Sequence, residues 1–248
     1  MFFVIKTAAA FLYAEADDQS ERVDEVLHGM MVAVESEAGD WLYVRTSYDY
    51  CGWLRRSFVC LPHDLVLKSY VNVHSADVLT APKVQSPLII CLNLGCAVHV
   101  VSHEVKGWTQ IALAGGGKGY IRTAFLSSFS EETERDALCR TAMLYKGVQY
   151  RWGGKSPLGI DCSGLCFMAY YLNGAAIFRD SRIKAGFPIK EIAPEQAKKG
   201  DLLYFPGHVG MLLDGDKMIH SSEANNGVRI ESLTDEWRAR ITAVGSIF

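Results

Sequence analysis

Gly159-Ile160-Asp161-Cys162-Ser163-Gly164 decides the fold of this 248-residue chain, because a Gly-rich loop ends there and an apolar helix begins. Three glycines and one proline make residues 150–160 a loop. Apolar residues then recur at three- and four-residue spacing, at Leu165, Met168, Ala169 and Leu172. The sequence therefore predicts a helix that starts near Cys162.

A thiol in the first turn of a helix is suited to nucleophilic chemistry. Asp161 or Ser163 can cap the free N–H groups of that turn. The positive end of the helix dipole favours the thiolate over the thiol, and the thiolate is the reactive form. We therefore expect Cys162 to be a nucleophile that is ionised and not buried.

Two histidines supply candidate partners for this thiol. His208 starts an apolar strand, and a turn at residues 214–217 leads into a second strand that brings His220 back beside it. We interpret His208 as the general base and His220 as the group that orients its imidazole. A structural role is the commoner one for a His on an apolar strand. Zinc ligation by Cys162, His208 and His220 is a further alternative that the helix start and the hairpin disfavour, so no metal or other cofactor is predicted.

Five ordered motifs resemble the NlpC/p60 family of papain-like cysteine peptidases. They are Tyr-Arg-Trp-Gly-Gly at 150–154, Asp-Cys-Ser-Gly at 161–164, Lys-Gly-Asp-Leu at 199–202, Gly-His-Val-Gly at 207–210, and Ile-His at 219–220. The resemblance covers roughly residues 131–248. It implies an α+β papain-like domain that hydrolyses peptide bonds in bacterial cell-wall peptides.

The resemblance also implies roles for residues around the nucleophile. It gives Tyr150 a contact with the nucleophile and the substrate, and Trp152 a place in the pocket lining. It gives Asp161 and Ser163 contacts with the substrate amine and backbone, for which helix capping alone is the alternative. The backbone N–H of Cys162 is a candidate oxyanion donor, assisted by the Tyr150 hydroxyl.

A second segment implied in substrate binding follows the helix. Asp180 and Ser181 lie in an Arg-Asp-Ser segment, where family members that cleave after γ-D-glutamate contact their substrate. The Gln usually found a few residues further on is replaced around Lys184-Ala185, which leaves the specificity open. A solvated loop is the alternative for both residues.

The first half of the chain contains an internal repeat. Trp108 lies 67 residues after Trp41, and each Trp precedes a Gly-aromatic strand, at Gly52 and Gly119. These are two copies of one small β-domain, and they resemble bacterial SH3-like domains. The predicted domains are two SH3-like barrels at residues 1–62 and 63–128, and the peptidase domain at 129–248.

Two local expectations concern the junction of these domains. Ser130-Glu131-Glu132-Thr133 resembles a capping box and predicts a helix from there to Lys146-Gly147. In the family, an SH3-like domain beside the peptidase can close one end of the cleft. The resemblance thus makes Asp49, in a polar loop, a candidate partner for a free substrate ammonium, with a solvated carboxylate as the alternative.

Composition excludes several classes of partner and bears on the compartment. The formal net charge of −3 predicts no nucleic-acid binding, and no apolar run is long enough to predict a membrane span. Seven cysteines without a C-x-x-C pair favour a reducing cytoplasm. No basic residue precedes the apolar N-terminal stretch, which disfavours a signal peptide. The sequence carries no signal of oligomeric state.

Resemblance to the three-domain members of the family implies a γ-D-glutamyl-L-diamino acid endopeptidase. Its substrates would be murein peptides with a free N-terminal L-Ala, as in cell-wall recycling, and the diamino acid is left open. An exported hydrolase of intact peptidoglycan is the first alternative. A non-catalytic wall-binding protein with a relic peptidase domain is the second.

Overall fold

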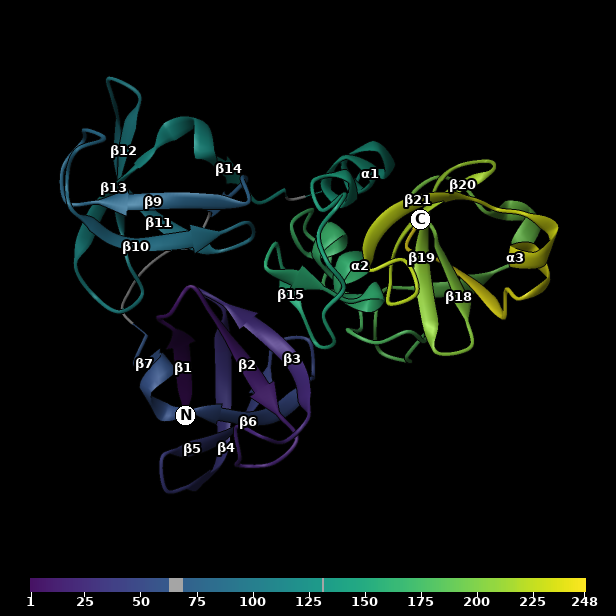
Figure 1. Ribbon diagram of the computed structural model, residues 1–248, viewed down its shortest axis with the longest axis horizontal. Coiled ribbons are helices and arrows are strands. Elements are labelled where there is room, and N and C mark those ends of the chain that lie inside the picture. The colour runs from purple at the N-terminus through teal and green to yellow at the C-terminus, as the bar shows by residue number, and fades with distance from the viewer. Residues whose placement is uncertain (63–68, 131) are drawn as a thin grey trace. The chain divides into compact units, whose positions relative to one another are not determined.

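The computed structural model describes residues 1–62, 69–130 and 132–248, except the side chains of residues 103 and 104. These residues form two compact units, Met1–Phe129 and Ser130–Phe248 (Figure 1). Part of the predicted second domain, residues 63–68, lies outside the described residues, as does Glu131 of the expected capping box. The predicted limits of the individual domains stay predictions.

The N-terminal unit begins with a seven-stranded antiparallel sheet. Its strands follow the order β3-β2-β6-β5-β4-β1-β7. A short 3-10 helix, η1 (Arg56–Phe58), precedes the last strand. The strands are β1 (Phe2–Ile5), β2 (Ala9–Tyr13), β3 (Arg22–Leu27), β4 (Met31–Ala38), β5 (Trp41–Thr46), β6 (Cys51–Arg55) and β7 (Val59–Cys60).

A second sheet in the same unit repeats this topology. Its order, β10-β9-β13-β12-β11-β8-β14, is that of the first sheet with every strand advanced by seven, and η2 (Thr123–Phe125) takes the place of η1. The strands are β8 (Ser69–Val71), β9 (Ser75–Leu79), β10 (Leu88–Asn93), β11 (Ala97–Val105), β12 (Trp108–Ala112), β13 (Lys118–Arg122) and β14 (Leu126–Ser128). The internal repeat is thus a repeat of strand order.

The repeat extends to side-chain packing. Arg55 lies over the ring of Trp41 at 4.1 Å, and Arg122 lies over the ring of Trp108 at 4.2 Å. In both copies the two residues are cross-strand partners, so the cation covers a buried indole on its neighbouring strand. Closure of either sheet into a barrel stays a prediction.

The two sheets meet at the imidazole of His28, which is 1% exposed. Its Nδ1 lies 3.1 Å from the carbonyl oxygen of Lys6, and its Nε2 accepts a hydrogen bond from the N–H of Ala114 at 3.2 Å. Since Nε2 accepts, Nδ1 carries the proton and donates to Lys6. A neutral imidazole thus joins the first sheet to the second.

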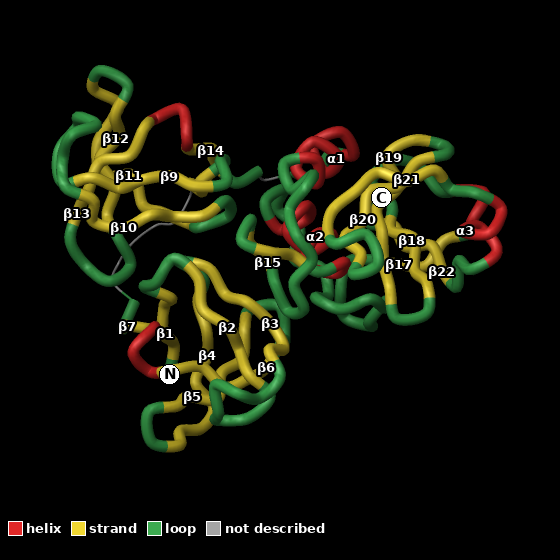
Figure 2. Tube along the Cα trace, viewed as in Figure 1, coloured by secondary structure: helices red, strands yellow, loops and turns green. Residues whose placement is uncertain are grey.

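The C-terminal unit combines three α-helices with a six-stranded antiparallel sheet (Figure 2). The helices are α1 (Arg135–Met143), α2 (Cys162–Tyr171) and α3 (Asp235–Ala239). The sheet order is β17-β22-β18-β19-β20-β21. Its strands are β17 (Lys190–Ile192), β18 (Leu202–Phe205), β19 (His208–Asp214), β20 (Lys217–Ser222), β21 (Gly227–Ser232) and β22 (Ala243–Ser246). A 3-10 helix, η3 (Pro194–Gln196), and a hairpin of β15 (Lys155–Ser156) and β16 (Gly159–Ile160) complete the unit.

Helix α2 is the central element of this unit. Residues 162–170 are all buried, and the helix packs against α1, β19 and β20. A helix that is buried on all sides has no freedom to shift without disrupting the core. The position of its first residue is therefore fixed by packing.

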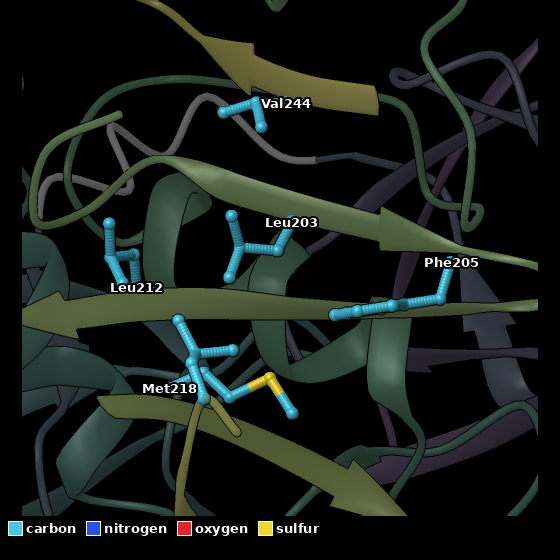
Figure 3. Packing of buried hydrophobic residues seen from close by; sticks show 6 residues of the cluster. Leu203, Phe205, Leu212, Met218 and Val244 are labelled. Atoms are coloured by element: carbon cyan, nitrogen blue, oxygen red, sulfur yellow. The ribbon is translucent and has the colours of Figure 1, made fainter. Parts of the chain in front are cut away.

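An apolar cluster lies on one face of the sheet (Figure 3). Side chains two residues apart along a strand share a face, which places Leu203 with Phe205 on β18. The buried members are Leu203, Phe205, Leu212, Met218, Leu233 and Val244. The ring of Trp237, on α3, packs against this cluster, so α3 covers part of that face.

The start of α1 differs from the sequence prediction. The helix begins at Arg135, and its N-cap residue Glu134 makes no side-chain capping bond. The hydroxyl of Thr133 donates instead to the carbonyl oxygen of Asn173 at 2.8 Å, just beyond the end of α2. A tertiary bond thus takes a hydroxyl that the prediction assigned to the capping box, and the helix ends at Met143 rather than at Lys146.

Candidate active site

Cys162 is the first residue of α2, as the sequence predicted. Asp161 is the N-cap residue, and its Oδ1 accepts a hydrogen bond from the N–H of Gly164 at 2.6 Å. Its Oδ2 accepts from the N–H of Gly153 at 2.9 Å. One carboxylate therefore ties the helix start to the preceding loop.

Arg179 holds this carboxylate from the other side, and sequence reasoning gave it no role. Its guanidinium contacts Oδ1 and Oδ2 of Asp161 at 2.9 Å each and donates to the Ser163 hydroxyl at 2.7 Å. It also donates to the carbonyl oxygen of Gly154 at 3.1 Å, and Arg179 itself is 3% exposed. The only sequence signal was its place beside Asp180. Because Asp161 and Ser163 are engaged in this network, helix-start positioning is their observed role, and their contact with substrate stays a prediction.

The thiol of Cys162 differs from expectation in its ionisation. Cys162 is 7% exposed, and burial, followed by the charge of Asp161, raises the pKa of the thiol to about 11. Hydrogen bonds from the backbone N–H groups of Val209 and Ser163 lower the pKa by less than burial raises it. The expectation of an ionised, unburied sulfur is wrong: at neutral pH the resting group is a thiol.

The hairpin of β19 and β20 brings the two predicted histidines into contact. His208 Nε2 lies 2.8 Å from His220 Nδ1, and the ring planes meet at 77°. His220 is fully buried. One of these nitrogens donates and the other accepts, so the pair shares a single proton along this line.

Both imidazoles are neutral at pH 7. Burial, followed by smaller electrostatic effects of His220 and Arg240, lowers the pKa of His208 to about 4. Burial also lowers the pKa of His220, and the carboxylate of Glu231 opposes that shift. A neutral imidazole can accept a proton, which an imidazolium cannot.

The thiol lies beside the start of β19, the strand that carries His208. The hydrogen bond between Cys162 and the N–H of Val209 places the sulfur beside the residue that follows His208. The Nε2 of His208 is occupied by His220, which leaves Nδ1 as the nitrogen able to face the thiol. Nδ1 is therefore the candidate acceptor for a proton from the sulfur.

Tyr150 and Trp152 lie in the loop that approaches the helix start. Tyr150 forms a parallel bridge with Ile160. Burial raises the pKa of its hydroxyl, and the nearby Cys162 and Asp161 raise it further, so the hydroxyl stays protonated and able to donate. Trp152 is 58% exposed, a large apolar surface beside the site.

The structure gives less direct support for the other predicted substrate-binding residues. Asp180 and Ser181 are half-buried, and the Asp180 carboxylate accepts from the N–H of Ser181 at 2.8 Å. Asp49 belongs to the N-terminal unit, where it pairs with Arg45. Its neighbour Tyr48 is buried and donates to Asp24 at 2.6 Å. The roles of Asp49, Asp180 and Ser181 stay predictions.

Two further residues surround the histidine pair and were not found from the sequence. The ring of Trp237 lies 5.5 Å from that of His220 and 6.2 Å from that of His208. Glu231 Oε2 lies 3.5 Å from His220 Nε2. No local pattern pointed to either residue, because their positions near the pair depend on how α3 and β21 pack.

The described part of the chain bears on metal binding and on membrane insertion. There, no group of three or more His, Cys, Asp or Glu side chains is arranged to hold a metal ion. No helix there combines the length and the apolar surface needed to cross a membrane.

Two family models match segments of this chain, one in each half. The family model described as NlpC/P60 family matches residues 147–246, and the one described as bacterial dipeptidyl-peptidase Sh3 domain matches residues 12–64. A curated relative named dipeptidyl-peptidase 6, from Lysinibacillus sphaericus, is 43% identical over 99% of this chain and 99% of its own length.

Two more distant proteins extend the comparison. A gamma-D-glutamyl-L-lysine dipeptidyl-peptidase from Bacillus subtilis (strain 168) is 24% identical, over 85% of this chain and 76% of its own. The crystal structure of an NlpC/P60 family protein from Bacillus cereus ATCC 10987 superposes with a TM-score of 0.86 at 21% identity and covers 98% of each chain. At that identity the likeness concerns the fold.

Proposed function

This chain belongs to the NlpC/P60 family, and we propose that it is a cysteine peptidase that hydrolyses the γ-D-glutamyl-L-diamino acid bond of murein peptides. The observation that carries the proposal is the histidine pair joined at 2.8 Å beside a thiol at a helix start. The relatives' names, dipeptidyl-peptidase 6 and gamma-D-glutamyl-L-lysine dipeptidyl-peptidase, support the class of bond.

The proposed reaction starts from a neutral thiol and a neutral imidazole. Because the pKa of Cys162 is raised to about 11 and that of His208 lowered to about 4, the proton leaves sulfur as the C–S bond forms rather than before it. His208 Nδ1 takes this proton, and the carbonyl becomes a tetrahedral oxyanion. His208 then protonates the leaving amine of the diamino acid, the C–N bond breaks, and a thioester remains. Water hydrolyses the thioester and restores the thiol.

Donors for the oxyanion lie at the helix start. The backbone N–H of Cys162 is one of the first N–H groups of α2, which have no carbonyl partner within the helix. The Tyr150 hydroxyl, kept protonated by its raised pKa, is the second. Donors fixed in place stabilise the charge that develops on the carbonyl oxygen.

We assign recognition of a free N-terminal L-Ala to a carboxylate outside the catalytic set. The candidate is Asp49 in the N-terminal unit, because a carboxylate can pair with an ammonium group as Asp49 pairs with Arg45. An acetylated amine carries no charge and would leave such a carboxylate unpaired.

We further propose that the protein works in a reducing compartment, as a cytoplasmic recycling enzyme does. All seven cysteines are free, and Cys96, Cys162 and Cys166 are buried. Free thiols in every position are typical of a cytoplasmic protein.

The test is digestion of L-Ala-γ-D-Glu-diaminopimelate with a free or an acetylated amine, read by mass spectrometry. We expect L-Ala-γ-D-Glu from the free-amine peptide only. Cys162→Ala is the control and should be inactive. Release of fragments from intact peptidoglycan would instead favour the exported hydrolase, and no cleavage of either substrate would favour the non-catalytic alternative.

A further inference from the structure

Glu231 stands behind the histidine pair, on the side away from His208. It lies on β21 opposite Met218, and its β-sheet neighbour along the diagonal is His220. Residues two apart on a strand share a face, so Glu231 and His220 project to the same side of the sheet. The carboxylate is thus the next polar group after the two imidazoles.

The order of protons along this line follows from the proposed chemistry. If His208 Nδ1 is to accept the thiol proton, the proton of the neutral ring sits on Nε2 and is donated to His220 Nδ1 at 2.8 Å. The proton of His220 then sits on its Nε2. Glu231 Oε2 lies 3.5 Å from that nitrogen.

The Nε2 of His220 needs such a partner. It is buried and makes no hydrogen bond of good geometry to the described residues, and Glu231 Oε2, at 3.5 Å, lies at the limit of bonding distance. A buried N–H without a partner is costly, so a small rotation that closes this gap is favourable. Catalytic hydrogen bonds are often long in the empty site and shorten when charge develops.

Glu231 is itself held in position. Its Oε1 accepts a hydrogen bond from the side-chain amide of Asn225, in the turn between β20 and β21. Its side chain is 28% exposed, so the carboxylate keeps contact with solvent while it faces the buried ring. The ring of Trp237 shields both imidazoles on the same side. The line from thiol to carboxylate therefore runs from the core to the surface.

We propose that Glu231 is a positioning residue: its carboxylate holds the proton of His220 on Nε2 and thereby leaves His208 Nδ1 free to take the thiol proton. The kinetic part of this inference rests on the proposed function. The carboxylate also stabilises the positive charge that forms on His208 during the reaction, through one intervening ring.

Other titratable or charged groups also lie near the histidine pair and affect its protonation. Cys162 approaches from α2, and Arg240, which follows α3, opposes a positive charge on His208. Arg229 is the register partner of His220 on β21. Arg240 disfavours a cation at the pair, and Glu231 is the group that opposes this effect.

The test compares Glu231→Gln with Glu236→Gln, which removes an equal charge from an exposed position on α3. We expect Glu231→Gln to lower kcat about tenfold, which is the scale seen for carboxylates that orient the histidine ligands of metal sites. KM should change less than twofold. The acid limb of the kcat/KM profile should move to lower pH, because loss of the carboxylate makes the pair harder to protonate. Glu236→Gln should match the wild type. Asn225→Ala, which loosens the carboxylate, should shift the limb in the same direction by less.

A second readout needs no substrate. Long-range ¹H–¹⁵N spectra report which nitrogen of each histidine carries the proton, and we expect Nε2–H for both rings of the wild type and a mixed population for His220 in Glu231→Gln. The proposal would be overturned if Glu231→Gln and Asn225→Ala both kept the acid limb of the pH profile and the His220 tautomer of the wild type. If the wild type were inactive on the peptide, the proposed function would be wrong. The tautomer of His220 could still be measured and would test the role of Glu231 separately.

Discussion

Arg179 binds both carboxylate oxygens of Asp161, each at 2.9 Å, with both side chains almost fully buried. Asp161 caps the helix that starts with Cys162, so the guanidinium fixes the nucleophile through one intermediate residue. A bidentate pair sets both distance and orientation, which a single hydrogen bond does not. The position of the thiol therefore depends on a residue beyond the end of its own helix.

Removing Arg179 should destabilise the C-terminal unit. Arg179→Ala leaves the Asp161 carboxylate buried without its cation, which costs about 3–5 kcal/mol in comparable pairs. Denaturant unfolding followed by tryptophan fluorescence measures this loss. Arg182→Ala is the control, because its side chain is 70% exposed and lies 3.7 Å from Asp180. A change below about 0.5 kcal/mol is expected for this surface position; equal effects in both variants would contradict the role given to Arg179.

The raised pKa of Cys162 predicts slow alkylation at neutral pH. Only the thiolate reacts with iodoacetamide, and with a pKa of about 11 its fraction rises tenfold for each pH unit between 7 and 10. The rate at Cys162, followed by mass spectrometry of its peptide, should rise accordingly. Exposure of the protein to the reagent at pH 6 should leave Cys162 unmodified. A rate that is already high and flat from pH 6 to 8 would mean that the resting site holds a thiolate–imidazolium pair.

Tyr150→Phe should lower kcat with little change in KM. The variant keeps the ring and removes the hydroxyl, which we assign to the oxyanion. Loss of one such donor costs about 100-fold in kcat in other acyl-transfer enzymes. Steady-state kinetics on the free-amine peptide measure the effect, with circular dichroism as the check on folding. An unchanged kcat would leave the helix N–H groups as the donors and remove Tyr150 from the proposal.

The junction at His28 should weaken in acid. Burial lowers the pKa of His28 below its usual 6.5, so the unfolded chain binds the proton more readily than the folded one. Its contribution to stability is complete above about pH 6.5 and is lost as the pH falls through the lowered pKa. Thermal unfolding from pH 7 to 5 should therefore show a larger fall in Tm for the wild type than for His28→Gln. His74→Gln, a change at an exposed His, should follow the wild type.

Much of the architecture could be predicted from the sequence, because it is encoded in local periodicity. The 67-residue offset between Trp41 and Trp108 predicted two copies of one small β-domain. The arginine stacked on each indole was not predicted and was found in the structure. The glycines before Cys162 and the apolar spacing after it located the start of α2. The two strands around a four-residue turn were enough to bring His208 and His220 together.

Tertiary structure decided the rest. Arg179 and Glu231 reach the site from segments with no regular spacing to Cys162 or His220, so no local pattern identifies them. The ionisation of the thiol was predicted wrongly for a related reason. A helix start is visible in sequence, but the cost of burying charge depends on every element packed around the sulfur. Local sequence patterns predicted the start of the helix at Cys162 and the hairpin that joins His208 to His220. The packing of the elements around these side chains determined their protonation.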